Sequence, residues 1–127
     1  MAQDNVELLR GTYEAFGRGD VPTVLGSFAD DITWHVPAVL PTGGDAKGKE
    51  EVAQFFQRLV ETWKEGLALD LRDYVASGDR VCVIGRAEGR LDGTQTGYGF
   101  VHCWTVRDGL CVDFDEYVDP DQEMLKR

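Results

Sequence analysis

A histidine and a glutamate in the C-terminal third of the chain fall where an alternating strand pattern would place apolar side chains. Residues two apart in a strand share one face, so His102 and Glu116 each share a face with apolar residues of their own predicted strand. The residues that flank them on those faces are Phe100, Trp104, Phe114 and Val118. Because a titratable group is costly to bury among such neighbours, we expect these two side chains to be paired or to do chemistry.

Proton transfer is the chemistry that suits such a pair. A carboxylate removed from water can take a proton from a carbon acid, and a neighbouring histidine can protonate or hydrogen-bond the enolate oxygen that develops. We therefore predict Glu116 as a base and His102 as an acid or oxyanion donor. The alternative interpretation is structural: His102 is a core residue with a polar partner, and Glu116 either completes a buried pair or lies in water near a cavity mouth.

The N-terminal half of the chain is predicted to be helical. Apolar residues recur at helical spacing from about residue 4 to 18, with Asp4 as the expected N-cap. In a short second helix, Asp20 is the cap and Phe28 belongs to the buried side. A third helix, from about 49 to 64, has the strongest pattern, and its apolar residues are Val52, Phe55, Phe56, Leu59, Val60 and Trp63.

Strands account for most of the remaining chain. One strand is predicted over 32–36, ended by Pro37, and residues 38–48 are predicted as a loop. Four antiparallel strands then follow between about residues 67 and 119. Helices grouped ahead of a hairpin-rich sheet indicate an α+β fold. We expect a cone-shaped, curved mixed or antiparallel sheet wrapped around three N-terminal helices and enclosing an apolar cavity.

The composition limits the classes of function. The 127 residues fit a single domain, 1–127, and a hydrophobic content of 43% is typical of a globular protein. The net charge of −10 argues against nucleic acids and anionic membrane surfaces as partners. No apolar run approaches the roughly 18 residues of a membrane helix. Three cysteines with no paired spacing and no signal peptide predict buried thiols in the cytoplasm.

Other constellations in the chain do not predict a site. His102 and the adjacent Cys103 point to opposite faces of a strand, which excludes a shared metal site or a cysteine nucleophile there. The C-terminal aspartates lack the glycine-centred loop of a calcium site. Gly97 and Gly99 are not followed by a helix, so they form no phosphate loop. We therefore expect no metal and no cofactor.

Several short motifs occur in an order and at spacings that are characteristic of one superfamily. The motifs are Tyr13-Glu14-Ala15-Phe16-Gly17-Arg18-Gly19-Asp20, Phe28-Ala29-Asp30-Asp31-Ile32-Thr33-Trp34, Ser77-Gly78-Asp79-Arg80-Val81 and Trp104-Thr105-Val106-Arg107-Asp108-Gly109. With them, nearly the whole chain resembles the nuclear-transport-factor-two-like superfamily, in its SnoaL-like or ketosteroid-isomerase-related branch. The resemblance implies the fold but not the reaction, since the superfamily includes isomerases, epoxide hydrolases, polyketide cyclases, dehydratases and proteins that catalyse nothing.

Two catalytic arrangements of that superfamily are incomplete in this sequence. Ketosteroid isomerases place their base in the pattern Asp-Asp-x-Thr-x-x-Asp-Pro, and Val36 stands at the position of the base. Limonene-epoxide-hydrolase-like members need an arginine and an aspartate two residues apart, where this chain has Gly85 and Ala87. Arg86 and Glu88 lie one residue away, which places them on the opposite face of the strand.

SnoaL-type polyketide cyclases provide the best match for the candidate site. These enzymes use a carboxylate and a histidine that face one cavity with aromatic walls, and Glu116 and His102 match them in position and type. Gly85 and Ala87 are expected to leave space for a bulky ligand. The candidate substrate-binding residues are Tyr13, Phe16, Trp34, Phe56, Phe100, Trp104 and Phe114, with simple core packing as the alternative.

Two functions of different classes remain. The first is a cofactor-free enzyme of isomerase, cyclase or dehydratase type that acts on a hydrophobic, carbonyl-bearing small molecule. The second is a non-catalytic small-molecule-binding or dimerisation domain of the same fold. The resemblance also implies a homodimer formed through the open face of the sheet, since so apolar a face is rarely left in water. The residues expected on that face are Val101, Cys103, Thr105, Cys111 and Tyr117.

Overall fold

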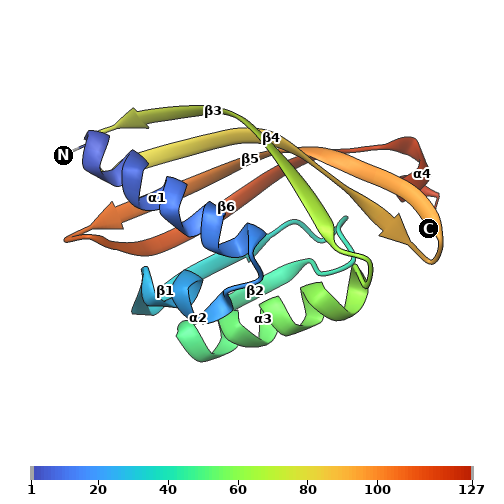
Figure 1. Cartoon of the computed structure of the whole chain (residues 1–127), viewed down its shortest axis with the longest axis horizontal. Helices are drawn as coiled ribbons and strands as arrows, with labels where there is room; N and C mark the ends of the chain where they lie inside the picture. Colours follow the sequence, from blue (N-terminus) through green and yellow to red (C-terminus); the bar gives the residue numbers. More distant parts are fainter. Residues whose placement is uncertain (1, 127) are drawn as a thin grey trace.

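Three helices cover one face of a curved, six-stranded sheet in the computed structural model, which describes residues 2–126 (Figure 1). The helices on that face are α1 (Ala2–Gly17), α2 (Val21–Gly26) and α3 (Lys49–Thr62), and the short α4 (Gln122–Leu125) follows the last strand. The strands are β1 (Phe28–Val36), β2 (Gly44–Lys47), β3 (Leu67–Ser77), β4 (Arg80–Leu91), β5 (Thr94–Arg107) and β6 (Leu110–Pro120). The predicted α+β class and the curved sheet around three N-terminal helices are confirmed.

The sheet is mixed because the first strand pairs with the last. Its order is β2-β1-β6-β5-β4-β3, in which β1 runs parallel to β6 and every other neighbouring pair is antiparallel. The prediction of a loop over 38–48 was wrong at β2, which pairs with β1 through four residues. This strand has the glycine and aspartate of a turn, and its pairing with β1 outweighs that local preference.

The helix boundaries follow the predicted capping only in part. The Asp20 carboxylate accepts hydrogen bonds from the backbone N–H of Thr23, at 3.2 Å, and from the Thr23 hydroxyl, at 2.6 Å, which confirms the cap of α2. Asp4 lies within the first turn of α1 and is not its N-cap; acidic residues are favoured at either position. Phe28 begins β1 and does not belong to α2.

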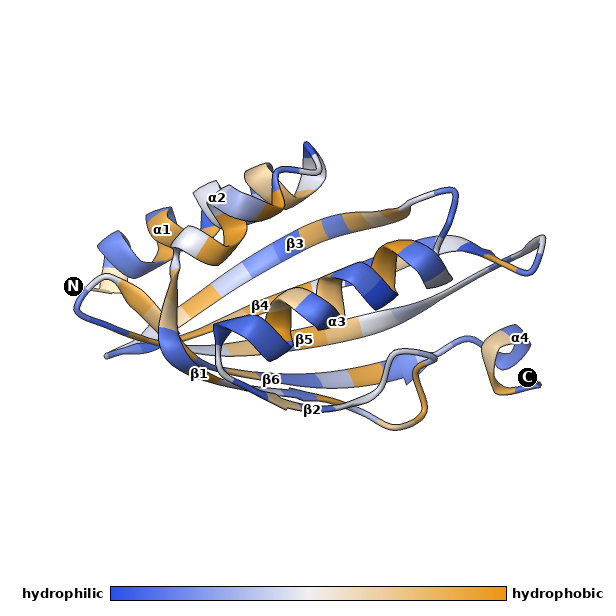
Figure 2. Ribbon diagram, turned by 90° about the horizontal axis from the view of Figure 1, so that it is seen from below, coloured by the Kyte–Doolittle hydropathy of each residue, from blue (hydrophilic) through white to orange (hydrophobic). Residues whose placement is uncertain are grey.

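The core lies between the helices and the sheet. Hydrophobic and hydrophilic segments alternate along α3 and β3, as expected of elements that bury one face (Figure 2). The buried residues of α3 are Val52, Phe55 and Phe56. Within residues 2–126, no helix is both long and apolar enough to span a bilayer.

A β-bulge in β6 changes which residues face the core. The pairing of β5 with β6 shifts register between Thr105 and Val106, which leaves Val112 as the extra residue of β6. Cys111 therefore turns inward and is fully buried. The predicted alternation placed Cys111 outward and Val112 inward, and it was wrong there because a bulge reverses the parity of the strand. Glu116, beyond the bulge, keeps its predicted inward orientation.

Candidate functional site

His102 and Glu116 form a hydrogen bond on the inner face of the sheet. They are direct cross-strand partners on β5 and β6, and His102 Nε2 lies 3.1 Å from Glu116 Oε2. Their side chains are only 10% and 6% exposed. The strand pattern predicted that both side chains face inward, and the structure brings them into direct contact.

A tyrosine and a tryptophan extend this pair into a chain of four polar groups. The Tyr13 hydroxyl, carried by α1, accepts a hydrogen bond from Trp104 Nε1 at 2.9 Å and lies 2.6 Å from His102 Nδ1. Burial raises the pKa of Tyr13 well above its ordinary value, so the hydroxyl keeps its proton. Since an indole nitrogen can only donate, we assign the Tyr13 proton to the bond with Nδ1. His102 then carries its own proton on Nε2 and donates it to Glu116, so both ring nitrogens are engaged.

Two aromatic rings hold the imidazole of His102 in place. Phe100 stacks on it with ring centroids 3.9 Å apart and an interplanar angle of 14°, and Tyr13 lies nearly parallel to it at 5.9 Å. The expectation that Gly85 leaves space for a ligand was wrong, because Phe100 occupies that space. A Cβ atom on Gly85 would lie 2.8 Å from Phe100 Cζ and 2.4 Å from the carbonyl oxygen of Asp70.

The chain of polar groups borders a partly enclosed cavity with a volume of about 70 Å³. His102 and Glu116 both contribute to its lining. Of the seven predicted substrate-binding residues, the six that line the cavity are Tyr13, Phe16, Trp34, Phe56, Trp104 and Phe114. Phe100 does not line it. The cavity therefore has mostly aromatic walls, with one carboxylate in its lining.

Tyr98 also lines this cavity, although the sequence analysis did not select it. It lies on β5 at the same parity as His102, and it is 5% exposed. Burial raises the pKa of Tyr98 far above its ordinary value, and the charge of Glu116 adds to that effect. The parity of the strand, which Tyr98 shares with Phe100 and His102, was the signal that could have identified it.

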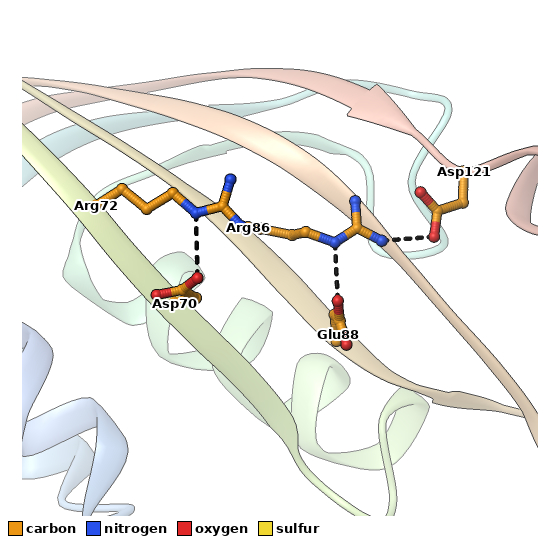
Figure 3. Close-up of polar contacts among 5 residues, drawn as sticks. All are labelled: Asp70, Arg72, Arg86, Glu88 and Asp121. Atoms are coloured by element: carbon orange, nitrogen blue, oxygen red, sulfur yellow. Dashed lines mark hydrogen bonds and ion pairs between the residues drawn. The ribbon is translucent and has the colours of Figure 1, made fainter.

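Arg86 and Glu88 lie on the outer face of the sheet, where they form ion pairs away from the cavity (Figure 3). Arg86 Nε is 2.8 Å from Glu88 Oε1, and Arg86 Nη2 is 2.7 Å from Asp121 Oδ2. The inner positions that an epoxide hydrolase would use are occupied by Gly85 and Ala87, as the sequence indicated. Within residues 2–126, no cluster of three or more histidine, cysteine or acidic side chains could hold a metal ion.

The buried tyrosines predict a loss of stability at alkaline pH. The pKa values of Tyr13 and Tyr98 are raised by burial, so both keep their protons in the folded state above pH 10, whereas the unfolded chain releases them near pH 10. The unfolded state then binds fewer protons, and the free energy of unfolding falls as the pH rises above about 10. Urea denaturation between pH 8 and 11, together with tyrosinate absorbance, measures this. A full tyrosinate signal at pH 11 from a protein of undiminished stability would contradict it.

The sequence and the structure both match known proteins. Residues 9–114 match the family model of the SnoaL-like domain. An NTF2-like protein of unknown function from Burkholderia pseudomallei is 32% identical, with a TM-score of 0.86 over 97% of this chain and 95% of that chain. An NTF2-like protein from Burkholderia xenovorans is 31% identical, with a TM-score of 0.80 over 94% and 92% of the two chains.

A third similar structure is that of TerC co-crystallised with polyporic acid. TerC is 29% identical, with a TM-score of 0.82 over 91% of this chain and 92% of that chain. No curated protein matches the sequence. The family model covers most of the chain, and the structural matches extend over nearly all of it. The chain therefore belongs to the SnoaL-like family of the nuclear-transport-factor-two-like superfamily.

Proposed function

We propose that this protein is a cofactor-free enzyme that transfers a proton within a hydrophobic, carbonyl-bearing small molecule, with Glu116 as the base. The observation that carries the proposal is a buried carboxylate in the lining of an aromatic-walled cavity. In such surroundings, Glu116 takes a proton from the carbon next to a carbonyl group, and the electrons of the C–H bond move to the carbonyl oxygen. The proton then returns to the same carbon or to another one, as in isomerases and related enzymes.

His102 supports the base in this mechanism. Its Nε2–H donates to one carboxylate oxygen of Glu116, which fixes the orientation of the carboxylate. From the sequence, His102 was predicted to be an acid or oxyanion donor, but the bonds to both of its ring nitrogens favour a positioning role instead. Trp104 and Tyr13 in turn fix which nitrogen of the imidazole carries the proton.

The volume and the aromatic lining of the cavity favour a small aromatic or cyclic ligand. A dry cavity of about 150 Å³ lined by apolar side chains can hold benzene, so a volume of about 70 Å³ admits part of a ring while the rest extends toward the mouth. The similarity to TerC, which was co-crystallised with polyporic acid, also supports a small-molecule ligand.

Deuterium exchange tests the proposal without knowledge of the natural substrate. The protein is incubated in D₂O with a panel of aryl and cyclic ketones, among them acetophenone and 1-indanone, and proton NMR follows the signal of the hydrogens next to the carbonyl. We expect exchange faster than in buffer alone, with a rate that saturates as the ketone concentration rises. Exchange at the buffer rate throughout the panel would count against the enzyme and in favour of the second candidate.

The second candidate is a non-catalytic small-molecule-binding or dimerisation domain. It is favoured by the complete hydrogen bonding of Tyr13 and His102, because buried polar networks of this kind also occur for structural reasons. On this alternative, ketones shift the indole NMR signals of the cavity tryptophans in a saturable manner, yet their hydrogens exchange no faster than in buffer.

We also propose a homodimer formed through the outer face of the sheet. Ile84, Tyr117 and Val75 are exposed on this face, with Val101 and Cys103 half-buried. Contiguous apolar surface of this kind commonly marks an interface. Two residues that the sequence analysis placed on this face, Thr105 and Cys111, are buried within the chain itself and are not part of the proposal.

Light scattering during size exclusion measures the oligomeric state. We expect a dimer mass at micromolar concentration for the natural sequence and a monomer mass for Ile84→Glu, because a charge placed in an apolar interface must lose its water. Val60→Glu, at an exposed position of α3, is the matched control and is expected to remain a dimer. A monomer mass for the natural sequence would contradict the prediction.

A further inference from the structure

Tyr98 is a buried residue whose hydroxyl group has no hydrogen-bond partner among residues 2–126. Its ring packs near Trp63, with centroids 6.4 Å apart, and the residue is 5% exposed. The hydroxyl makes no hydrogen bond to any residue in the range 2–126 that the structure describes. The other cavity tyrosine, Tyr13, has two partners for its hydroxyl. Among the described residues, the hydroxyl of Tyr98 is therefore available to a molecule from outside the chain.

Tyr98 lines the cavity and its hydroxyl oxygen is not enclosed, in contrast to two other unpaired polar groups within residues 2–126. Trp34 Nε1 and Thr96 Oγ1 also lack partners within residues 2–126, but protein atoms enclose both of them. Tyr98 lines the cavity, and its oxygen is not sealed off in this way. A ligand that enters the cavity can therefore contact Tyr98.

The position of Tyr98 complements that of Glu116. Tyr98 lies four residues from His102 along β5, which is roughly 13 Å of strand, and Glu116 is the cross-strand partner of His102. The two side chains thus reach the cavity from separate points along the sheet. Both side chains line the same cavity, and burial raises the pKa of Tyr98, which keeps its hydroxyl protonated and able to donate.

We propose that Tyr98 donates the hydrogen bond that holds the carbonyl oxygen of the ligand and thereby presents the neighbouring C–H group to Glu116. This inference rests on the proposed function. It identifies the residue that donates a hydrogen bond to the carbonyl oxygen, since both ring nitrogens of His102 are already engaged. In the reaction, the C–H bond breaks, its proton moves to Glu116, and its electrons form a C=C bond while the carbonyl becomes an enolate oxygen bound by Tyr98. Return of the proton from Glu116 to carbon restores the carbonyl and the carboxylate. The ligand class is therefore aryl or cyclic ketones with an acidic C–H next to the carbonyl.

A matched pair of small molecules isolates the contribution of the hydroxyl to binding. Acetophenone has the carbonyl oxygen and ethylbenzene lacks it, and the dissociation constant of each is measured by NMR titration with the natural sequence and with Tyr98→Phe. We expect the variant to bind acetophenone about 3- to 10-fold more weakly and ethylbenzene unchanged, since one neutral hydrogen bond is lost. Tyr117→Phe, which removes an outer-face hydroxyl, is the control and is expected to alter neither constant.

Proton exchange provides the second measurement. We expect Tyr98→Phe to lower kcat for ketone exchange by about 10²- to 10³-fold, as the loss of an oxyanion donor does, with a smaller change in KM. The assignment of Tyr98 would be overturned if Tyr98→Phe lost affinity equally for both molecules, or lost none for acetophenone. This conclusion would hold even if proton exchange persists and depends on Glu116. A further outcome is that the natural sequence binds acetophenone more tightly than ethylbenzene and yet exchanges no ketone. If that difference in affinity disappears in Tyr98→Phe, Tyr98 is supported as the hydrogen-bond donor to the ligand, and only the catalytic proposal is rejected.

Discussion

Glu116→Gln is expected to slow ketone proton exchange by about 10²- to 10⁴-fold, the usual contribution of a general base. Glutamine has nearly the same size as glutamate, and its amide oxygen can still accept the hydrogen bond from His102 Nε2. It cannot accept a proton from carbon, so the chemistry is lost while the shape of the cavity is kept. The initial rates of deuterium incorporation into acetophenone and 1-indanone, measured by NMR, give the ratio.

Asp115→Asn is the matched control for this experiment. Asp115 is the preceding residue on β6, but it lies on the outer face, where it accepts a hydrogen bond from the Tyr117 hydroxyl. The substitution removes the same charge from the same strand without entering the cavity, and we expect an unchanged rate. Equal rates for Glu116→Gln and Asp115→Asn would show that Glu116 is not the base.

Trp34→Ala is expected to reduce the free energy of unfolding by about 3–5 kcal/mol, as large-to-small substitutions of buried aromatic residues do. Trp34 is 5% exposed and stacks on Phe114 with ring centroids 4.0 Å apart. It also packs against Phe55 and Trp104, with centroids at 5.5 Å and 5.8 Å. Its removal leaves a void between α3 and the sheet that these rings cannot fill. Urea denaturation followed by far-ultraviolet circular dichroism measures the loss.

Trp34→Phe separates packing from polarity at this position. Because Trp34 Nε1 has no hydrogen-bond partner within residues 2–126, its removal sacrifices no bond, and most of the ring packing remains. We therefore expect a much smaller loss of stability than for Trp34→Ala. If the two variants were equally unstable, the aromatic packing of Trp34 would not be what stabilises this part of the core.

The elements with a strong periodic pattern could be predicted from the sequence, and those defined by pairing could not. The third helix was predicted correctly because its apolar residues follow a helical period over several turns. Strand β2 was missed because its four residues have the composition of a turn and are ordered only by pairing with β1. The bulge at Val112 was missed because the residue before it, Cys111, is also compatible with burial, so alternation alone could not reveal the reversed parity.

The same distinction applies to the candidate site: features set by a local pattern could be predicted, and those set by packing could not. Strand parity alone predicted that His102 and Glu116 both face the interior. The bond between Tyr13 and His102 joins residues 89 positions apart, and it depends on how α1 packs on the sheet, which no local pattern specifies. The stacking of Phe100 over Gly85 depends in the same way on side-chain packing across two strands.

The parallel pairing of β1 with β6 also determines the order in which a newly made chain can fold. In the described sheet, β2 pairs with β1, and β1 joins the other strands through β6, which follows β3, β4 and β5 in the sequence. A nascent chain that ends before Leu110 contains the strands of the β3, β4 and β5 meander, but it lacks β6, the strand through which β1 pairs with them. Glu116 lies on β6, so the strand that joins β1 to this meander also brings the proposed base into the candidate site.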